Sequence, residues 1–203
     1  MSSNQPKSVH RPYGGVSADE RRDERRRRLL DAGLELFGTK GIAATTIADV
    51  CSEAGLTKRY FYESFATIDE LAGDVFADIT ARLVAQVAPA IAAGAGVDPR
   101  PPLTVYLGAV LGDPRLARFL GTESRTPALA ERQAAFGSRA VAVWFRSAPG
   151  ADDAAARLRA HAFAGAIDEV TLAWTKGELN LSVEEVIDEL VDIFHRIMAA
   201  KTP

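Results

Sequence analysis

Two short segments of this 203-residue chain carry hydroxyl, cationic and aromatic side chains in an order that suits contact with a nucleic acid. The residues concerned are Thr45, Thr46, Thr57, Lys58, Arg59, Tyr60 and Tyr62. Hydroxyl and ammonium groups donate hydrogen bonds to phosphate oxygens, whereas an arginine matches the two acceptors on a guanine edge and an aromatic ring can touch a thymine methyl. We therefore expect phosphate contacts from the threonines, Lys58 and Tyr62, and base contacts from Arg59 and Tyr60.

Each of these residues also has a purely structural interpretation. Thr46 and Thr57 stand where hydroxyl groups cap the first turn of a helix, a role that is compatible with phosphate binding. Tyr62 could instead belong to the core, and Lys58 and Arg59 could be solvated surface. Both interpretations stay open at the level of the sequence.

Two short helices joined by a glycine-containing turn are expected to position these residues. The first follows Thr46 and buries Ile47 and Val50, and Gly55 ends it. The second runs from Lys58 to Phe65. A longer helix precedes them, because Ser17 and Glu20 form a capping box and Gly41 suits a left-handed helix end. This order is the outline of a helix-turn-helix.

The rest of the chain is predicted to be helical, with no strand. A second capping box, Thr67 with Glu70, opens a long helix that Pro89 or residues 94–96 should end. Further helices are expected near 102–112, 114–121, 127–148 and 152–176, and a last one begins at the capping box of Ser182. The predicted fold class is therefore all-α, with a disordered arm at 1–16, a DNA-binding domain at 17–66 and a larger helical core at 67–203.

Composition and charge restrict the class of protein. The net charge is −3, but residues 1–66 contain 11 Lys/Arg and 9 Asp/Glu, whereas residues 67–203 contain 13 and 18. A weakly basic end on an acidic body fits a specific DNA-binding domain better than a DNA-coating protein. The single cysteine, Cys51, is typical of a reducing compartment. We find no apolar run of membrane length and no signal peptide, so we expect a cytoplasmic protein without a membrane partner.

The arginine-rich stretch of residues 21–28 has two interpretations. Its arginines alternate with Asp23 and Glu24, which is typical of a solvated helix face with ion pairs between successive turns. Four consecutive arginines exceed what such pairing needs, and the helix leads into the DNA-binding segment. A supplementary contact with phosphate or the minor groove is therefore an equal alternative.

The segments 41–46 and 55–65 resemble the sequence signature of the TetR family of bacterial transcriptional regulators. That family typically has Leu-Phe before a glycine, Thr-Thr before the first short helix, and Tyr-x-x-Phe in the recognition helix. Leu36-Phe37, Thr45-Thr46 and Tyr62-x-x-Phe65 match at the same spacing. The resemblance is specific over residues 25–75. Over residues 76–203 only the number and the length of the expected helices resemble those of the family.

This sequence departs from the family pattern at three positions. Ile68 stands where a lysine often begins the fourth helix, so one phosphate contact is missing. Arg59 stands where glycine is frequent, and Tyr60 replaces a small residue. These bulkier side chains indicate either a different operator preference or base contacts that are shifted by one position along the helix.

The resemblance implies a transcriptional regulator, most often a repressor. It implies a homodimer that binds pseudo-palindromic double-stranded operator DNA and is released by a small-molecule effector, unidentified here, that binds the C-terminal core and shifts the helix beginning at Thr67. The alternative from another class is a helical small-molecule binding protein without a DNA function.

The effector pocket and the dimer interface are predicted less sharply. Aromatic side chains often line apolar ligand cavities, although each could be ordinary core. The pocket candidates are Tyr106, Phe119, Phe136, Trp144, Phe145, Phe163 and Trp174, with His161 as a ligand-orienting residue and Arg139, Glu123 and Asp168 as polar contacts or inter-helix partners. The interface candidates on the last two helices are Leu158, Ile167, Leu190, Val191 and Phe194.

We expect no catalytic, metal or cofactor site. The chain has three histidines, none paired with another at metal-ligand spacing, and it has neither a glycine-rich phosphate loop nor a nucleophile elbow. Cys51 falls on the apolar side of a short helix, which favours a buried thiol over a nucleophile.

Overall fold

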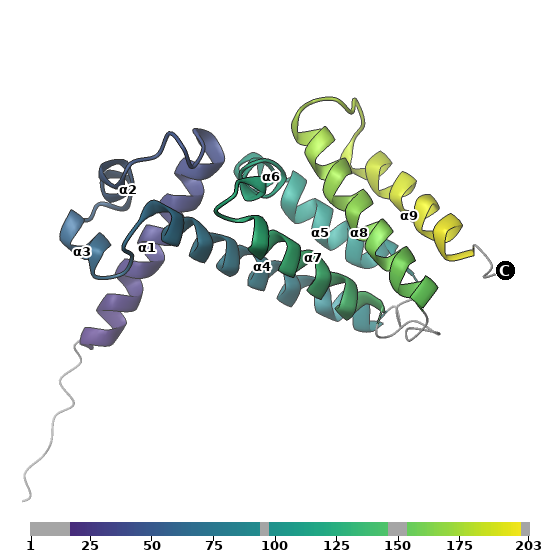
Figure 1. Cartoon of the computed structure of the whole chain (residues 1–203), viewed down its shortest axis with the longest axis horizontal. Helices are drawn as coiled ribbons and strands as arrows, with labels where there is room; N and C mark the ends of the chain where they lie inside the picture. The colour runs from purple at the N-terminus through teal and green to yellow at the C-terminus, as the bar shows by residue number, and fades with distance from the viewer. Residues whose placement is uncertain (1–16, 94–97, 146–153, 200–203) are drawn as a thin grey trace, which may run out of the picture.

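The computed structural model describes residues 17–93, 98–145 and 154–199, and all regular structure within these ranges is helical (Figure 1). The all-α prediction is confirmed, while the predicted arm at 1–16 lies outside the described residues. The helices are α1 (Ala18–Thr39), α2 (Ile47–Ala54), α3 (Lys58–Tyr62), α4 (Ile68–Ala93), α5 (Arg100–Leu111), α6 (Pro114–Gly121), the 3-10 turn η1 (Glu123–Arg125), α7 (Ala130–Phe145), α8 (Ala154–Thr175) and α9 (Val183–Ala199).

Helices α1 to α3 form a small unit at one end of the molecule. The Ser17–Glu20 capping box begins α1, as predicted, and Gly41 follows its end with a φ of 92°. Gly55 ends α2 in the left-handed conformation, with a φ of 61°, so the chain can turn directly into α3. Phe37, Phe61 and Val50 are fully buried between these helices.

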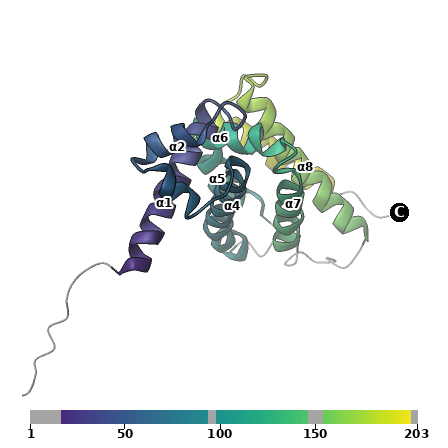
Figure 2. The same cartoon turned by 60° about the vertical axis from the view of Figure 1, so that its left-hand side comes forward.

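Helix α4 leaves the N-terminal unit and runs through the body (Figures 1 and 2). It packs against α1 at its start and against α5 and α7 further along. Of the two predicted ends of this helix, Pro89 is wrong, because α4 continues to Ala93, and the other, residues 94–96, lies outside the described residues. The helix past Pro89 still buries Ile91, and this packing offsets the hydrogen bond that proline cannot donate.

By length and composition alone, α4 is apolar enough to cross a membrane, which contradicts the expectation that the chain has no such run. Its packing gives the reason for this composition. Leu71, Val75 and Ile79 are buried in the core, while Asp78 on another face pairs with Arg82 at 2.7 Å. The helix is therefore packed as a core helix of the body.

The other boundaries follow the prediction closely. The sequence placed α6 at 114–121, where the structure has it, and α9 begins after Ser182 in a capping box with Glu185. The predicted helix at 127–148 begins later, at Ala130, because residues from Thr126 onward form a turn in which Leu129 N donates to Thr126 O at 2.9 Å.

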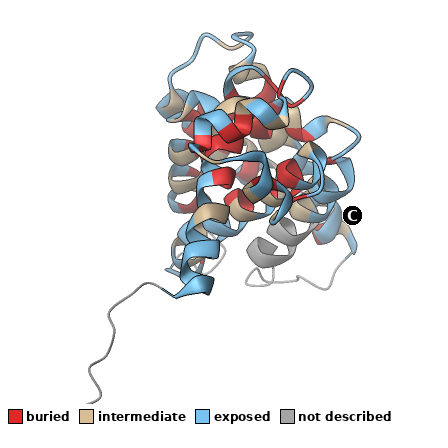
Figure 3. Ribbon diagram, turned by 90° about the vertical axis from the view of Figure 1, so that its left-hand side faces the viewer, coloured by how far each residue is buried: buried red, intermediate tan, exposed pale blue. Residues whose placement is uncertain are grey.

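The N-terminal unit touches the body through a close approach of α1 to α6. A Cβ atom at Gly38 would lie 2.6 Å from Cβ and from the main-chain oxygen of Arg115, so only glycine fits there without displacing α6. Figure 3 shows that buried residues continue from the N-terminal unit into the body, whereas the first turns of α1 are exposed.

We therefore predict that Gly38→Ala destabilises the protein by about 1–3 kcal/mol, because the methyl group must push the backbone of α6 away. Thermal or urea unfolding measures this change. Gly108→Ala in α5 is the matched control, since a Cβ there meets nothing within 4 Å, and it should leave stability unchanged or raise it by up to about 1 kcal/mol. Equal stability of the two variants would contradict the close approach.

Candidate nucleic-acid interface

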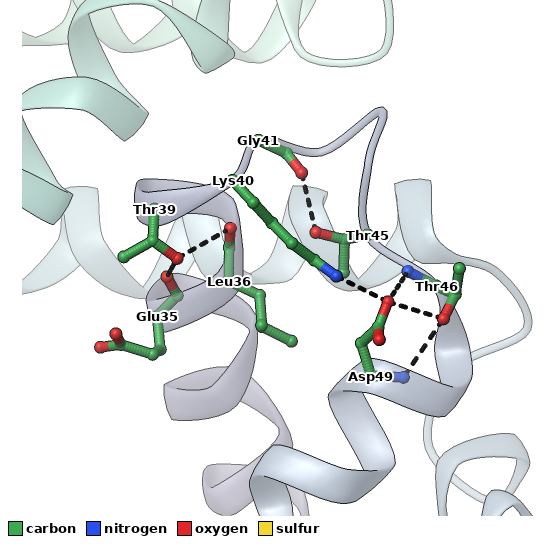
Figure 4. Close-up of polar contacts among 8 residues, drawn as sticks. All are labelled: Glu35, Leu36, Thr39, Lys40, Gly41, Thr45, Thr46 and Asp49. Atoms are coloured by element: carbon green, nitrogen blue, oxygen red, sulfur yellow. Dashed lines mark hydrogen bonds and ion pairs between the residues drawn. The ribbon is translucent and has the colours of Figure 1, made fainter.

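The start of α2 is held by a network around Asp49 (Figure 4). The Asp49 carboxylate accepts from Thr46 N at 2.9 Å, from the Thr46 hydroxyl at 2.7 Å and from Lys40 Nζ at 2.7 Å. Asp49 N in turn donates to Thr46 Oγ1 at 3.2 Å. The bonds from Lys40 and Thr46 hold the pKa of the Asp49 carboxyl below its usual range. Thr46 therefore caps α2, as the sequence predicts, and Lys40 ties the cap to the end of α1.

Thr45 requires a correction. It is buried, and its hydroxyl donates to the main-chain oxygen of Gly41 at 2.7 Å (Figure 4). The hydroxyl is used to close the loop between α1 and α2, so the side chain does not face a nucleic acid in this structure. Its role is to position the start of α2.

Helix α3 presents a row of exposed polar side chains. Lys58 and Arg59 are exposed, Tyr62 is 60% exposed, and Tyr60 is half-buried. Phe61, which stands between Tyr60 and Tyr62 in the sequence, is fully buried. It anchors the helix to the core, so that the polar side chains lie on the opposite, outer face. The alternative that Tyr62 belongs to the core is therefore wrong.

Thr57 stands at the N-cap position of α3, but its side chain makes no capping hydrogen bond. The expectation that its hydroxyl caps the helix is wrong. The side chain is exposed and precedes Lys58, so its hydroxyl is free of the structural task that Thr46 performs.

Arginines of α1 bind the N-terminal unit together. Arg28 Nη2 donates to the main-chain oxygen of Ala54 at the end of α2, and Arg26 pairs with Asp74 of α4 at 2.5 Å. The Arg26 guanidinium also lies 5.1 Å from the ring centroid of Phe65. These two residues join α1 to α2 and α4, which goes beyond a solvated face, whereas the ion pair of Arg27 with Glu24 at 2.5 Å fits the interpretation as a solvated face with ion pairs.

Glu63, immediately after α3, is an acceptor for three arginines and was missed by the sequence reasoning. Its carboxylate lies 3.1 Å from Arg59 Nε and 3.8 Å from Arg25 Nη2, and its main-chain oxygen accepts from Arg22 at 3.3 Å. The i,i+4 spacing of Arg59 and Glu63 was the signal that could have identified the first of these pairs. The contacts with Arg25 and Arg22 join segments about 40 residues apart, so only the tertiary structure could identify them.

The body contains a small polar cavity of about 10 Å³, room for about one water molecule. It is lined by Tyr106, Leu120, Gly121, Arg125, Gln133, Phe136, Asp168 and Thr171. Burial raises the pKa of the Asp168 carboxyl, against the opposing effects of Arg125 and Gln133. The buried Gln133 Oε1 has no hydrogen-bond partner among the described residues. Two of the predicted pocket residues, Tyr106 and Phe136, thus lie at one cavity, together with Asp168.

The other pocket candidates do not line this cavity. Phe119 is fully buried and stacks on Phe37, with 6.0 Å between ring centroids, so it belongs to the core. Trp174 is half-buried, and its indole Nε1 donates to Leu181 O at 3.1 Å. His161, expected to orient a ligand, is exposed on α8 and does not line this cavity. The side chains of Arg139, Trp144 and Phe145 lie outside the described residues.

The dimer-interface candidates divide into two groups. Leu158 is 70% exposed, and Ile167 and Val191 are half-buried, so these three remain available to a partner. Leu190 and Phe194 require a correction, because both are buried within the subunit. Phe194 packs edge-on against Phe163 of α8, with 5.1 Å between ring centroids, and this contact also places Phe163 in the core rather than in a pocket.

The α6–η1 segment, residues 114–125, touches both the cavity and the N-terminal unit. Leu120, Gly121 and Arg125 line the cavity. On the other side of the segment, Arg118 Nη1 donates to Thr39 O at 2.6 Å, and the Glu123 carboxylate accepts from Ile42 N at 2.9 Å. The same short segment therefore contacts both the cavity and the loop that precedes α2.

Within the described ranges, no group of three or more His, Cys, Asp or Glu side chains could hold a metal ion. Cys51 is buried in α2, and burial raises the pKa of its thiol.

Residues 29–75, which include α2 and α3, match the model of the family described as bacterial regulatory proteins, tetR family. An HTH-type transcriptional regulator of Bacillus subtilis (strain 168), YerO, is 39% identical over 49 residues. This match covers 24% of the present chain and 17% of that relative.

The whole fold is similar to solved structures of regulators. FadR from Bacillus subtilis, in complex with stearoyl-CoA, has a TM-score of 0.70 at 14% identity and covers 83% of this chain and 96% of its own. NalD of Pseudomonas aeruginosa, the secondary repressor of the MexAB-OprM multidrug efflux pump, has a TM-score of 0.63 at 17% identity, over 86% and 95% of the two chains. These likenesses concern the fold.

The different use of the two threonines gives a prediction about stability. Thr46→Ala should lower the free energy of unfolding by about 1 kcal/mol, because the α2 cap is lost. Thr57→Ala should change it by less than about 0.5 kcal/mol, because its hydroxyl caps nothing. Chemical unfolding of the two single variants measures the difference. If Thr57→Ala is as destabilising as Thr46→Ala, the assignment of caps is wrong.

The contact between Glu123 and Ile42 gives a second prediction. Glu123→Ala should accelerate hydrogen exchange of the Ile42 amide by about tenfold or more, since a hydrogen bond to a charged acceptor is lost. Glu184→Ala is the matched control, because Glu184 pairs with Arg100 in the body at 3.4 Å, and it should leave this amide unchanged. Unchanged exchange in Glu123→Ala would show that the contact does not hold in solution.

Proposed function

We propose that the chain is a sequence-specific DNA-binding regulator of the tetR type, because its residues 29–75 match the model of the tetR family of bacterial regulatory proteins. The observation that carries the proposal is the exposed face of α3, where Lys58, Arg59 and Tyr62 point outward from a helix that Phe61 anchors. Such a helix fits the major groove of B-DNA.

The chemistry of each side chain suggests its role on DNA. The Thr57 hydroxyl, the Lys58 ammonium and the Tyr62 phenol are donors suited to phosphate oxygens on either side of the groove. Arg59 and Tyr60 precede the buried Phe61 and are the side chains assigned to base edges. Thr46 is exposed at the start of α2, but its hydroxyl is engaged with Asp49, so its proposed role is to hold the start of α2 in place for a phosphate contact.

The regulator is proposed to act as a homodimer, with α8 and α9 pairing across a two-fold axis. Exposed Leu158 and half-buried Ile167 and Val191 supply apolar area outside the core of the subunit. Two-fold symmetry would place two α3 helices about 34 Å apart, one turn of DNA, so the operator is expected to be a pseudo-palindrome.

Release by a small-molecule effector is the proposed mode of regulation, with repression as the default state. Support comes from FadR, which was solved with stearoyl-CoA, and from NalD, a repressor of similar fold. The cavity around Tyr106, Phe136 and Asp168 is the proposed effector site, and a ligand must enlarge it to enter. Its walls adjoin α4 and the α6–η1 segment, so enlargement would shift the contacts of Glu123 and Arg118 with the N-terminal unit. Coupling of this kind typically changes DNA affinity by about 1–3 kcal/mol.

A protein of this kind works in the cytoplasm and needs neither a membrane nor a cofactor, and we assign it no catalytic residue. The second candidate function is a helical ligand-binding protein without a DNA function. The polar cavity favours it equally, so DNA binding is the property that separates the two.

Selection of operator fragments tests the proposal. Purified protein is bound to fragmented DNA from its source at moderate salt, and the retained DNA is sequenced. We expect a pseudo-palindrome that the double variant Arg59→Ala with Tyr60→Ala no longer retains, because both base-reading side chains are removed. Glu53→Ala, on the exposed end of α2, is the control and should retain it. If the wild-type protein enriches no sequence, the proposal fails and the ligand-binding alternative takes its place.

A further inference from the structure

The side chain of Arg59 is tethered by Glu63, the residue that follows α3. Its Nε donates to Glu63 Oε1 at 3.1 Å, one helical turn further along. Within the part of the chain that the structure describes, no contact is recorded for its two Nη groups, and the side chain is 85% exposed. The contact with Glu63 therefore uses the Nε–H of the guanidinium and leaves the edge formed by the two Nη groups available.

We propose that Glu63 is a positioning residue that presents the two Nη groups of Arg59 to a guanine, so that each operator half-site contains a guanine at the base pair that Arg59 reaches. This inference rests on the proposed DNA-binding function and adds to it the identity of one base. It also assigns a role in specificity to Glu63, a residue that itself need not touch the DNA.

The geometry of the guanidinium gives the reason. Guanine offers two acceptors, O6 and N7, side by side in the major groove, and two parallel N–H donors match them. An arginine without a tether is attracted equally to the nearby phosphates, which carry most of the negative charge. When Nε is bound by a carboxylate, the two Nη groups point away from it as a pair, and the side chain is aimed at a base edge.

The strength of the tether depends on water. In the free protein an ion pair this exposed contributes little, because water screens the two charges. Once the groove closes over Arg59, water is excluded and the same pair attracts more strongly. The tether thus acts mainly in the complex, where orientation matters for reading the base.

A carboxylate beside DNA is repelled by phosphate unless its charge is compensated, and α1 supplies that compensation. Arg25 Nη2 lies 3.8 Å from Glu63 Oε2, and Arg22 donates to the main-chain oxygen of Glu63 at 3.3 Å. The Arg25 guanidinium also lies 4.6 Å from the ring centroid of Tyr60. The same two residues, Glu63 and Arg25, therefore orient both side chains assigned to base reading.

The test compares specificity at a single base pair. The position read by Arg59 is found first, as the one whose base preference Arg59→Ala abolishes in the selected operator. Affinities are then measured, at one salt concentration, for four duplexes that differ only there and for an unrelated duplex of equal length. Wild type should prefer guanine by about tenfold or more.

Glu63→Ala should reduce this preference to less than about threefold, while affinity for the unrelated duplex stays equal or rises because a negative charge is removed. Glu53→Ala removes the same charge from α2 without touching Arg59, and it should keep the full preference for guanine. Glu63→Gln keeps an acceptor without the charge and should fall between wild type and Glu63→Ala. It also carries the test if the alanine variant does not fold.

The outcomes separate this inference from the proposed function. An enriched pseudo-palindrome without guanine at the position read by Arg59 overturns the inference alone. So does a full guanine preference in Glu63→Ala, or an equal loss of affinity for all duplexes, which would indicate a merely structural role. Failure to enrich any sequence overturns both.

Discussion

The close contact of α1 with α6 at Gly38 is the constraint on which the arrangement of the molecule depends. A Cβ at this position would lie 2.6 Å from the main-chain oxygen of Arg115, so the backbones of the two helices approach closely and leave no room for a side chain on Gly38. Arg115 then pairs with Glu35, one turn earlier in α1, at 2.7 Å. The N-terminal unit and the body are thereby joined at the end of α1, directly before the loop that leads to α2.

The α6–η1 segment next to this contact is connected both to the body and to the N-terminal unit. Towards the body, α6 and η1 form part of the wall of the cavity around Asp168. Towards the N-terminal unit, Glu123 and Arg118 bind the main chain at Ile42 and Thr39. Packed helices respond to strain by moving as units rather than by deforming continuously, because protein interiors are close to crystalline density. In the proposed regulation, a ligand that enlarges the cavity would therefore shift α2 and α3 as well as its own surroundings.

The charges of the N-terminal unit are organised around α3 rather than spread over a surface. Arg22, Arg25, Arg26 and Arg28 are all engaged with α2, α3, α4 or the residues that follow them. The low net charge of this region is consistent with that use, because much of its basic character holds the unit together. Among the described residues, Lys58 and Arg59 are exposed cations on α3, and they suit the short, specific DNA contact proposed above better than a general attraction to phosphate.

Features of the structure could be predicted from the sequence where they depend on residues close together in the chain. The capping boxes at Ser17 and Ser182, the left-handed glycines 41 and 55, and the limits of α6 were predicted correctly. Each depends on residues no more than a few positions apart, and such signals are read directly from spacing. The exposed residues of α3 were also identified, because the buried Phe61 and Phe65 set the phase of the helix.

Only the tertiary structure decided which distant residues a given side chain contacts. Thr45 and Thr46 are adjacent and chemically alike, yet one closes a loop and the other caps a helix. Leu190 and Phe194 share the apolar stripe of α9 with Val191, but both are buried within the subunit, where α9 packs against α5 and α8. Glu63 meets Arg22 and Arg25 only because α1 lies beside α3. The sequence by itself determined the helices, many of their ends and the face of α3 that turns outward, since these follow from local hydrogen bonding and periodicity. The tertiary structure decided which polar groups are consumed by packing and which stay free to bind, because that depends on contacts between residues far apart in the chain.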